Sequence, residues 1–205
     1  MKDIRLGGGR RVPSIVVGCM RLGALDRQNL GRFIHTALDC GANYFDHAVI
    51  YGGGACEERF GAAIRSDASI RRENLILQSK CGTRQGFYDS SREHLLRAVD
   101  GILKRLQTDY LDVLLIHHPD ALTEPEEVAD AFDELERKGK VRCFGVSNHK
   151  PMQIELLKRT VRQPLLINQL QFSLPVSNMV ANGMEVNMNL PAPLTGMGAC
   201  WTTPG

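Results

Sequence analysis

The sequence predicts an α/β domain of barrel type, in which a parallel sheet is built from repeated βα units. From Ile15 onward, short apolar runs alternate with amphipathic stretches, and the runs recur about every 30 residues. Ionisable residues stand at the ends of several runs, where α/β barrels collect their chemistry. The glycines after the first run do not form the G-x-G-x-x-G pattern of a classical dinucleotide-binding fold, which favours a barrel.

A β-hairpin is expected before the barrel, because Ile4–Leu6 and Arg11–Pro13 flank the glycine turn Gly7–Gly9. A phosphate-cradling loop is the less favoured interpretation, since such a loop lies between a strand and a helix. The expected barrel strands are residues 15–17, 43–46, 75–80, 111–116, 141–146 and 165–168. No linker interrupts this series, so residues 1–188 are interpreted as one domain.

Helices are expected between these strands, over about residues 27–40, 56–66, 91–106, 125–139 and 151–160. The clearest of them follows Ser90 or Ser91, either of which can cap it. Pro125 suits the first turn of the fourth helix, and Gly139 suits its end. The resulting order of elements is that of consecutive βα units.

Composition and charge exclude several classes of protein. The net charge of +2, without a dense run of Lys or Arg, gives no reason to expect nucleic acid or an anionic membrane as partner. No apolar stretch is long enough to span a bilayer. The six cysteines are scattered without a C-x-x-C pair, and no signal peptide is recognised, so reduced thiols and a cytoplasmic location are expected.

Four side chains form the candidate catalytic site: Asp46, Tyr51, Lys80 and His117. Asp46, Lys80 and His117 each follow an apolar run, and Tyr51 lies five residues after Asp46. A phenol has a reference pKa near 10, and a neighbouring ammonium favours the phenolate form. Lys80 can therefore assist a phenolic proton donor, Asp46 can orient Lys80, and His117 can donate a hydrogen bond to a substrate oxygen. The set predicts reduction of a carbonyl by a nicotinamide cofactor, with Tyr51 supplying the proton.

Each of these residues also has a simpler interpretation. An Asp or Lys at a strand end is commonly a solvated loop residue, and a His there is commonly a hydrogen-bonded structural residue. Tyr51 can be a loop aromatic that covers the barrel mouth. The joint placement of the four at strand ends, in an order that one reaction can use, favours a site.

Several motifs resemble the aldo-keto reductase family, and the similarity extends from about residue 3 to about residue 188. The motifs are Asn43–Ala48 with Tyr51-Gly52, Ser79–Gly82, Leu115–Asp120, Gly145–His149 and Asn168-Gln169. The resemblance implies a (β/α)8 barrel that reduces small carbonyl compounds with NADPH. It makes Tyr51 the proton donor, Asp46 and Lys80 its tuning pair, and His117 the group that orients the substrate. It also implies that Ser147, Asn148 and Gln169 hold the nicotinamide carboxamide, whereas on their own these residues suggest a polar turn and a buried glutamine.

The predicted barrel is incomplete and carries an irregular tail. Six βα units are counted where the resemblance implies eight, and such barrels typically have about 250 residues. The chain is therefore expected to be a C-terminally truncated member, without the last two units, which in the family bind the cofactor phosphates. Residues 189–205 lack helical or strand periodicity, and the hypothesis is a shifted reading frame near Asn189. Sequencing the gene tests it, because an immediate stop codon in the alternative frame would remove the idea.

Three other functions stay open at this stage. The first is a Schiff-base aldolase, since a barrel lysine such as Lys80 can attack a carbonyl. The second is a metal-dependent hydrolase using His117, His118 and Asp46, although the ligand spacing of a metal site is not apparent and no metal is expected. The third is a catalytically inactive truncated remnant. The substrate, the oligomeric state and the preference for NADPH over NADH are not determined by the residues.

Overall fold

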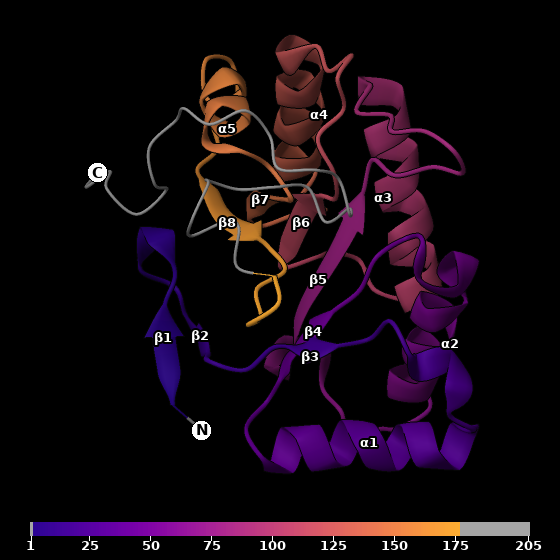
Figure 1. Ribbon diagram of the computed structural model, residues 1–205. Helices are drawn as coiled ribbons and strands as arrows, with labels where there is room; N and C mark the ends of the chain where they lie inside the picture. Colours follow the sequence, from indigo (N-terminus) through magenta and orange to yellow (C-terminus); the bar gives the residue numbers. More distant parts are fainter. Residues whose placement is uncertain (1, 177–205) are drawn as a thin grey trace.

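A curved parallel sheet with helices along its outer side forms the centre of the molecule (Figure 1). The computed structural model describes residues 2–176 of the 205. Six parallel strands lie side by side in the order β3-β4-β5-β6-β7-β8, which is also their order along the chain. Neighbouring parallel strands joined in sequence by helices are the arrangement of an α/β barrel. The predicted fold class is confirmed, with six strands of a barrel present among the described residues.

The barrel elements alternate as the sequence predicts. The strands are β3 (Val17–Gly18), β4 (Tyr44–Asp46), β5 (Ile76–Cys81), β6 (Val113–Ile116), β7 (Phe144–Ser147) and β8 (Leu165–Gln169). The helices are α1 (Arg27–Asp39), α2 (Ala55–Arg65), α3 (Arg92–Leu106), α4 (Pro125–Arg137) and α5 (Pro151–Leu157). Most of the predicted boundaries therefore fall within one to three residues of the observed ones.

Helix α3 illustrates why these residues form these elements. Ser91 is its N-cap, and its hydroxyl oxygen accepts a hydrogen bond from the backbone N–H of His94 at 3.4 Å. The stripe of Leu95, Val99 and Ile102 is fully buried against the sheet and the neighbouring helices. Gln107 ends the helix in the left-handed conformation, with φ of 53°. The capping residue and the apolar periodicity thus indicate the same helix, and its N-cap is Ser91 rather than Ser90.

The first barrel strand is the one element that the sequence misplaces. Ile15 and Val16, which were expected to begin it, are 57% and 44% exposed, and pairing with β4 starts only at Val17. The reason lies in the preceding hairpin, β1 (Asp3–Arg5) and β2 (Arg11–Pro13), whose register ends with Pro13 opposite Asp3. The residues between β2 and β3 connect the hairpin to the edge of the sheet and so cannot join the ladder.

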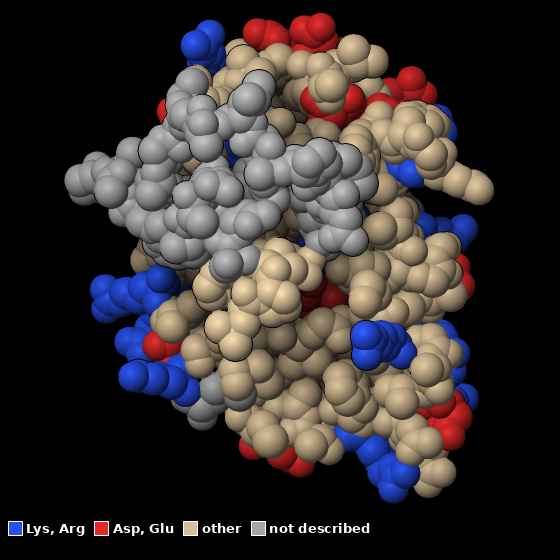
Figure 2. All heavy atoms as spheres, viewed as in Figure 1, with Lys and Arg blue, Asp and Glu red and all other residues tan. Residues whose placement is uncertain are grey.

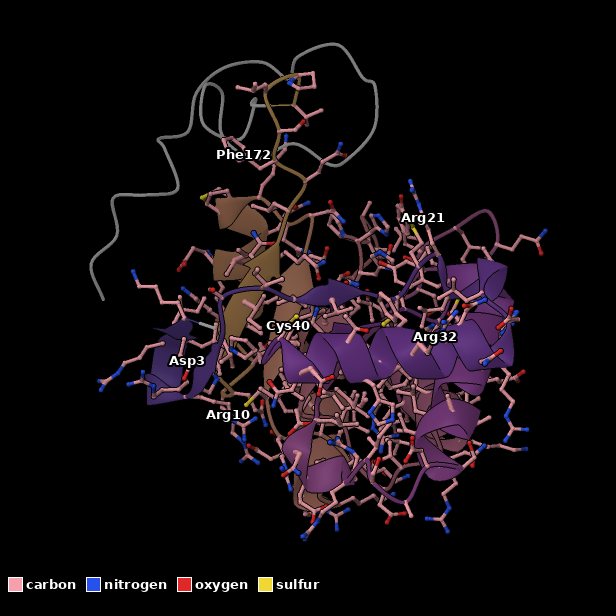
Figure 3. All side chains as sticks on the ribbon, turned by 90° about the horizontal axis from the view of Figure 1, so that it is seen from below. Asp3, Arg10, Arg21, Arg32, Cys40 and Phe172 are labelled. Atoms are coloured by element: carbon pink, nitrogen blue, oxygen red, sulfur yellow. The ribbon has the colours of Figure 1, made fainter. Side chains whose placement is uncertain are left out.

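The predicted hairpin closes the end of the barrel at which the strands begin. Val12 of β2 is buried together with Tyr44, Val113 and Leu115, whose side chains project from β4 and β6 into the barrel interior. Arg10 also reaches Asp112, with 3.7 Å between Nη1 and Oδ1. Figure 3 shows the hairpin, with Asp3 and Arg10, at one side of α1, whereas Phe172 lies beyond β8 at a different side of the molecule. The hairpin therefore supplies the apolar floor beneath the interior side chains.

Some predictions concern residues that the structure does not describe. The irregular tail at residues 189–205 and the domain boundary at residue 188 lie outside residues 2–176. Within the described residues, β3 pairs only with β4 and β8 pairs only with β7. No helix in this part is long and apolar enough to cross a membrane.

Helices α2 and α3 approach so closely that Gly61 cannot carry a side chain. A Cβ atom at Gly61 would lie 2.3 Å from the backbone oxygen of Arg105, which cannot move without shifting α3. We expect Gly61→Ala to lower the free energy of unfolding by roughly 3 kcal/mol through overpacking. The measurement is urea denaturation followed by circular dichroism.

Gly31→Ala is the matched control for this substitution. Gly31 lies in α1, and a Cβ atom there would have no neighbour within 4 Å. The better helix propensity of alanine should then raise the stability by about 1 kcal/mol. Equal effects of the two substitutions would contradict the close-packing explanation.

Candidate functional site

The predicted catalytic residues meet inside the barrel, at the end where the strands finish. Asp46 is the last residue of β4, Lys80 the fifth residue of β5, and His117 follows β6 directly. Tyr51 begins a short 3-10 turn, η3 (Tyr51–Gly54), between β4 and α2. Parallel strands all finish at the same end of the sheet, so residues far apart in sequence become neighbours there.

Lys80 is the centre of the site. Its side chain is 1% exposed, and Nζ lies 2.6 Å and 2.7 Å from the two carboxylate oxygens of Asp46. The same nitrogen lies 3.1 Å from the phenolic oxygen of Tyr51 and 3.1 Å from the backbone oxygen of His47. A buried ammonium of this kind requires such oxygens, because burial removes its hydration. The structure thus brings Asp46, Lys80 and Tyr51 into one hydrogen-bonded group.

Three consecutive glycines allow Tyr51 to reach this position. Gly52, Gly53 and Gly54 have φ values of 59°, 63° and 96°, in the left-handed region that disfavours other residues. They turn the chain sharply between Tyr51 and the start of α2. A Cβ atom at Gly54 would also lie 2.9 Å from Cδ of Arg105. The glycines that follow Tyr51 in sequence are therefore required by the geometry of its loop.

His117 completes the group from the side of β6. Its ring stands edge-on to the ring of Tyr51, with 6.2 Å between the centroids. Burial lowers the pKa of His117 to about 3, and electrostatic repulsion from His118, when it is protonated, and from Lys80 acts in the same direction. The imidazole is therefore neutral at physiological pH and carries one N–H, which suits it to donate a hydrogen bond.

The residues expected to hold a nicotinamide amide lie together at the ends of β7 and β8. Ser147 Oγ donates to the backbone oxygen of Gln169 at 2.8 Å, and Asn148 Nδ2 donates to the backbone oxygen of His117 at 3.0 Å. Asn148 adopts φ of 60°, which asparagine tolerates better than most residues. Gln169 Nε2 donates to Asp46 Oδ2 at 3.0 Å. Gln169 thus contacts the Asp46–Lys80 pair directly, and Ser147 and Asn148 are joined to the backbone of Gln169 and His117.

Sequence reasoning missed two residues of this site, Tyr44 and Gln78. Gln78 Nε2 donates to Asp46 Oδ1 at 2.6 Å, and Tyr44 donates its hydroxyl hydrogen to Gln78 Oε1 at 2.7 Å. Both residues stand in strands that the sequence pattern presents as simple apolar runs. The two-residue period of a strand places Tyr44 on the same face as Asp46, and Gln78 on the same face as Lys80. That period was the signal that could have identified them.

A second buried polar group lies on the other face of β5 and was also missed. Ser79 Oγ donates to Glu57 Oε1 at 2.6 Å, and Arg105 Nε donates to Glu57 Oε2 at 2.7 Å. Glu57 is fully buried near the start of α2. Because α2 follows the Tyr51 turn directly, this contact fixes the loop against α3 and β5.

A groove lies beside the site, between the loops that follow β5 and β6. Its volume is about 600 Å³, and its lining residues are Thr83, Arg84, Gly86, Phe87, Tyr88, Asp120, Ala121 and Leu122. The ring of Tyr88 stacks on His118 at 5.0 Å, and His118 stacks on His117 at 4.4 Å. Figure 2 shows charged side chains mainly around the periphery of this view of the molecule and mostly uncharged ones near its centre. The aromatic stack connects the groove to the site.

The part of the chain that the structure describes contains neither a cluster of metal ligands nor paired cysteines. Within residues 2–176, no group of three or more His, Cys, Asp and Glu side chains is placed to hold a metal ion. The five cysteines in this range are all unpaired, and Cys19, Cys56 and Cys81 are buried. Burial raises the pKa of the Cys81 thiol to about 12, which keeps it protonated and unreactive.

Comparisons with a family model, with curated proteins and with solved structures all find similarity to oxidoreductases of one family. Residues 14–186 match the model of the Aldo/keto reductase family. The chain is 39% identical over 185 residues to the uncharacterized oxidoreductase YcsN of Bacillus subtilis, and 41% identical over 157 residues to the oxidoreductase YdhF of Escherichia coli. The fold is similar to that of the aldo-keto reductase AKR11C1 from Bacillus halodurans in its holo form, with a TM-score of 0.74 and 32% identity.

These similarities cover much of this chain but only part of each relative. The matches span 84%, 73% and 84% of the chain for YcsN, YdhF and AKR11C1, respectively. They span 61%, 52% and 58% of those proteins. The chain therefore corresponds to between half and two thirds of the length of these relatives.

Three buried histidines predict that the protein loses stability in mild acid. Burial lowers the pKa of His47 and His117 to about 3 and that of His149 to about 4, against about 6.5 in an unfolded chain. As the pH falls below about 6.5, the unfolded state takes up protons that the folded state does not, so stability decreases. Each histidine should remove about 1.4 kcal/mol between pH 7.5 and 5.5. Urea denaturation at the two pH values measures the sum.

His47→Leu tests the contribution of a single histidine. Both ring nitrogens of His47 are buried without a hydrogen-bond partner in the described structure, and its ring packs edge-on against Phe60 at 4.6 Å. The apolar variant should therefore fold and should show a smaller difference in stability between the two pH values. The same difference in variant and wild type would contradict the assignment.

Proposed function

Since the chain belongs to the aldo/keto reductase family, we propose that it reduces an aldehyde or ketone to an alcohol, with NADPH as reductant and Tyr51 as proton donor. The observation that carries the proposal is the contact of 3.1 Å between Lys80 Nζ and the phenolic oxygen of Tyr51. A cytoplasmic location and a small-molecule carbonyl substrate belong to the same proposal. Its chemistry can be assigned residue by residue.

Tyr51 is the proton donor in this mechanism. Reduction adds a hydride to the carbonyl carbon and a proton to the carbonyl oxygen, so the O–H bond of Tyr51 breaks as the O–H bond of the alcohol forms. The negative charge left on the phenolic oxygen develops beside the ammonium of Lys80. An ammonium held in a water-poor site stabilises such a charge strongly, because little solvent screens it. Asp46 keeps the ammonium in place through both of its oxygens.

His117 orients the substrate in this mechanism. It is neutral at physiological pH, and its ring faces Tyr51 across the site. A hydrogen bond from its ring N–H to the carbonyl oxygen would direct that oxygen toward the phenol of Tyr51. A protonated imidazole at this position would be an additional acid, and the lowered pKa of His117 leaves that role to Tyr51.

The amide and hydroxyl groups at the ends of β7 and β8 fit the carboxamide of a nicotinamide. Ser147 and the side chains of Asn148 and Gln169 provide both hydrogen-bond donors and acceptors. Gln169 uses one amide hydrogen toward Asp46 and accepts one hydrogen bond from Gln78, which leaves a further hydrogen and a further lone pair. When bound, NADPH supplies the hydride. The residues of this chain would hold its amide end next to the Asp46–Lys80 pair.

The contacts of Lys80 argue against an aldolase. A Schiff-base lysine must be a free neutral amine with space for a substrate carbon. Nζ of Lys80 instead contacts four oxygen atoms, two of them from a carboxylate, and its side chain is 1% exposed. We therefore expect no adduct on Lys80 when the protein is treated with borohydride and an aldehyde. Mass spectrometry of the digested protein measures this.

Tyr51→Phe tests the proposed proton donor. The variant should lower kcat for aldehyde reduction by about 10³-fold, because a positioned general acid contributes about 10²–10⁴-fold. Binding of NADPH, followed by quenching of protein fluorescence, should be unchanged. Consumption of NADPH followed by absorbance gives the rate.

Tyr110→Phe is the matched control, because it removes the same hydroxyl at the opposite end of the sheet. The ring of Tyr110 lies between Arg72 and Arg142, with each guanidinium carbon within 4 Å of the centroid. This variant should keep wild-type kcat. Undiminished activity of Tyr51→Phe would contradict the proposed role, and absence of NADPH binding by the wild-type chain at millimolar cofactor would favour the inactive remnant instead.

A further inference from the structure

A chain of neutral side chains supports the catalytic ion pair from within the barrel. It consists of Tyr44 from β4, Gln78 from β5 and Gln169 from β8. Tyr44 donates to Gln78 Oε1 at 2.7 Å, and Gln78 Nε2 lies 2.9 Å from Gln169 Oε1 and 2.6 Å from Asp46 Oδ1. Three strands thus contribute to a hydrogen-bonded layer that ends on the carboxylate of Asp46.

The contacts define the orientation of Gln78. Among residues 2–176, the hydroxyl of Tyr44 is the hydrogen donor that contacts Oε1 of Gln78, and burial of Tyr44 raises the pKa of this hydroxyl, so it stays protonated. The carboxylate of Asp46 can only accept hydrogen bonds, so the amide nitrogen of Gln78 must face it. The reversed amide would place a carbonyl oxygen against the carboxylate. Asp46 therefore selects the orientation of the amide, and the hydrogen bond from Tyr44 to Oε1 holds Gln78 in that orientation.

The layer leaves the carboxylate of Asp46 no freedom to rotate. Oδ1 accepts from Lys80 and Gln78, and Oδ2 accepts from Lys80 and Gln169. Each carboxylate oxygen therefore has one charged and one neutral donor. A fixed carboxylate holds the ammonium of Lys80 at a fixed place, and that ammonium is 3.1 Å from the oxygen of Tyr51. The position of Lys80 relative to Tyr51 thus depends on groups that touch neither Tyr51 nor the groove.

We propose that Gln78, held in place by its hydrogen bond from Tyr44, is a positioning residue for proton transfer from Tyr51. This inference rests on the proposed function. Gln78 acts through Asp46, whose carboxylate it fixes, and Asp46 directs Lys80 to the phenolic oxygen. Gln169, itself one of the residues expected to hold the nicotinamide, donates to the same carboxylate. The hydrogen-bonded layer therefore connects the proton-donating side of the site with the hydride-donating side.

Gln78→Met tests the proposal, because methionine keeps the length of the side chain and removes both hydrogen-bonding groups. We expect kcat for aldehyde reduction to fall about 10- to 100-fold, since small displacements of catalytic groups have effects of this size. KM for the aldehyde should change less than about twofold, because the side chain of Gln78 binds Tyr44, Asp46 and Gln169 and so acts through Asp46 rather than on the substrate. A variant whose KM rises while kcat is unchanged would overturn the proposal.

Gln163→Met is the matched control. Gln163 is a buried glutamine remote from the site, and its Nε2 donates to the carboxylates of Asp133 at 2.7 Å and Glu136 at 3.0 Å. It should show a similar change in thermal stability and wild-type kcat. An equal loss of kcat in both variants would mean that the effect of Gln78 is only structural, which overturns the proposal.

Tyr44→Phe provides a second variant and a test of the order of the chain. It should lower kcat less than Gln78→Met, and the double variant should lose no more than Gln78→Met alone, because both changes interrupt the same path. If Gln78→Met does not fold, the kcat and KM of Tyr44→Phe test the proposal instead, and a lower kcat with a nearly unchanged KM is expected. Multiplicative losses in the double variant, or an unchanged kcat in Tyr44→Phe, would overturn the inference.

A crystal structure of Gln78→Met separates this inference from the proposed function. We expect the separation between Lys80 Nζ and the oxygen of Tyr51 to increase beyond hydrogen-bonding distance. If the wild-type chain does not reduce carbonyls, the proposed function fails, and this separation still decides whether Gln78 positions Lys80. An unchanged Asp46–Lys80–Tyr51 geometry in the variant would overturn the inference.

Discussion

The buried ion pair between Lys80 and Asp46 is the constraint on which the rest of the site depends. A charged amine that is 1% exposed has lost its hydration, and only a well-oriented carboxylate and further oxygen atoms can replace it. Gln78 and Gln169 satisfy the carboxylate from one side, and Tyr51 and the backbone of His47 satisfy the amine from the other. The hydrogen bonds from these residues therefore compensate for the loss of hydration of the buried Lys80–Asp46 pair.

The surrounding barrel is shaped to bring this unit together. Gly145 on β7 faces the interior, and a Cβ atom there would lie 2.6 Å from the backbone oxygen of Ile167 and 2.7 Å from a methyl carbon of Leu115. The absence of a side chain lets Leu115 of β6 and Ile167 of β8 pack closely against Gly145 from both sides. The hairpin then covers the apolar layer below with Val12. The curvature of the sheet brings Gln169 of β8 within reach of Asp46 of β4, 123 positions earlier in the sequence (Figure 1).

Alternate residues of β5 serve two different purposes. Lys80 and Gln78 face the interior and bind the carboxylate of Asp46, whereas Ser79 faces the helices and binds the buried carboxylate of Glu57. Arg105 neutralises that carboxylate and fixes α2 to α3. Because α2 starts at the end of the Tyr51 turn, the second ion pair supports the loop that carries the phenol. The two ion pairs thus hold Lys80 and Tyr51 from opposite faces of one strand.

The sequence by itself determined the order and type of the barrel elements, because apolar periodicity, the Ser91 cap and the glycine turns act over a few neighbouring residues. It also indicated the strand-end residues Asp46, Lys80 and His117 and the loop residue Tyr51, whose roles are proposals. Only the tertiary structure decided that Ile15 and Val16 lie outside the sheet and that Tyr44, Gln78 and Glu57 are buried partners of charged groups. Such contacts join distant segments, and their existence depends on the curvature and register of the sheet, which no local pattern of residues specifies.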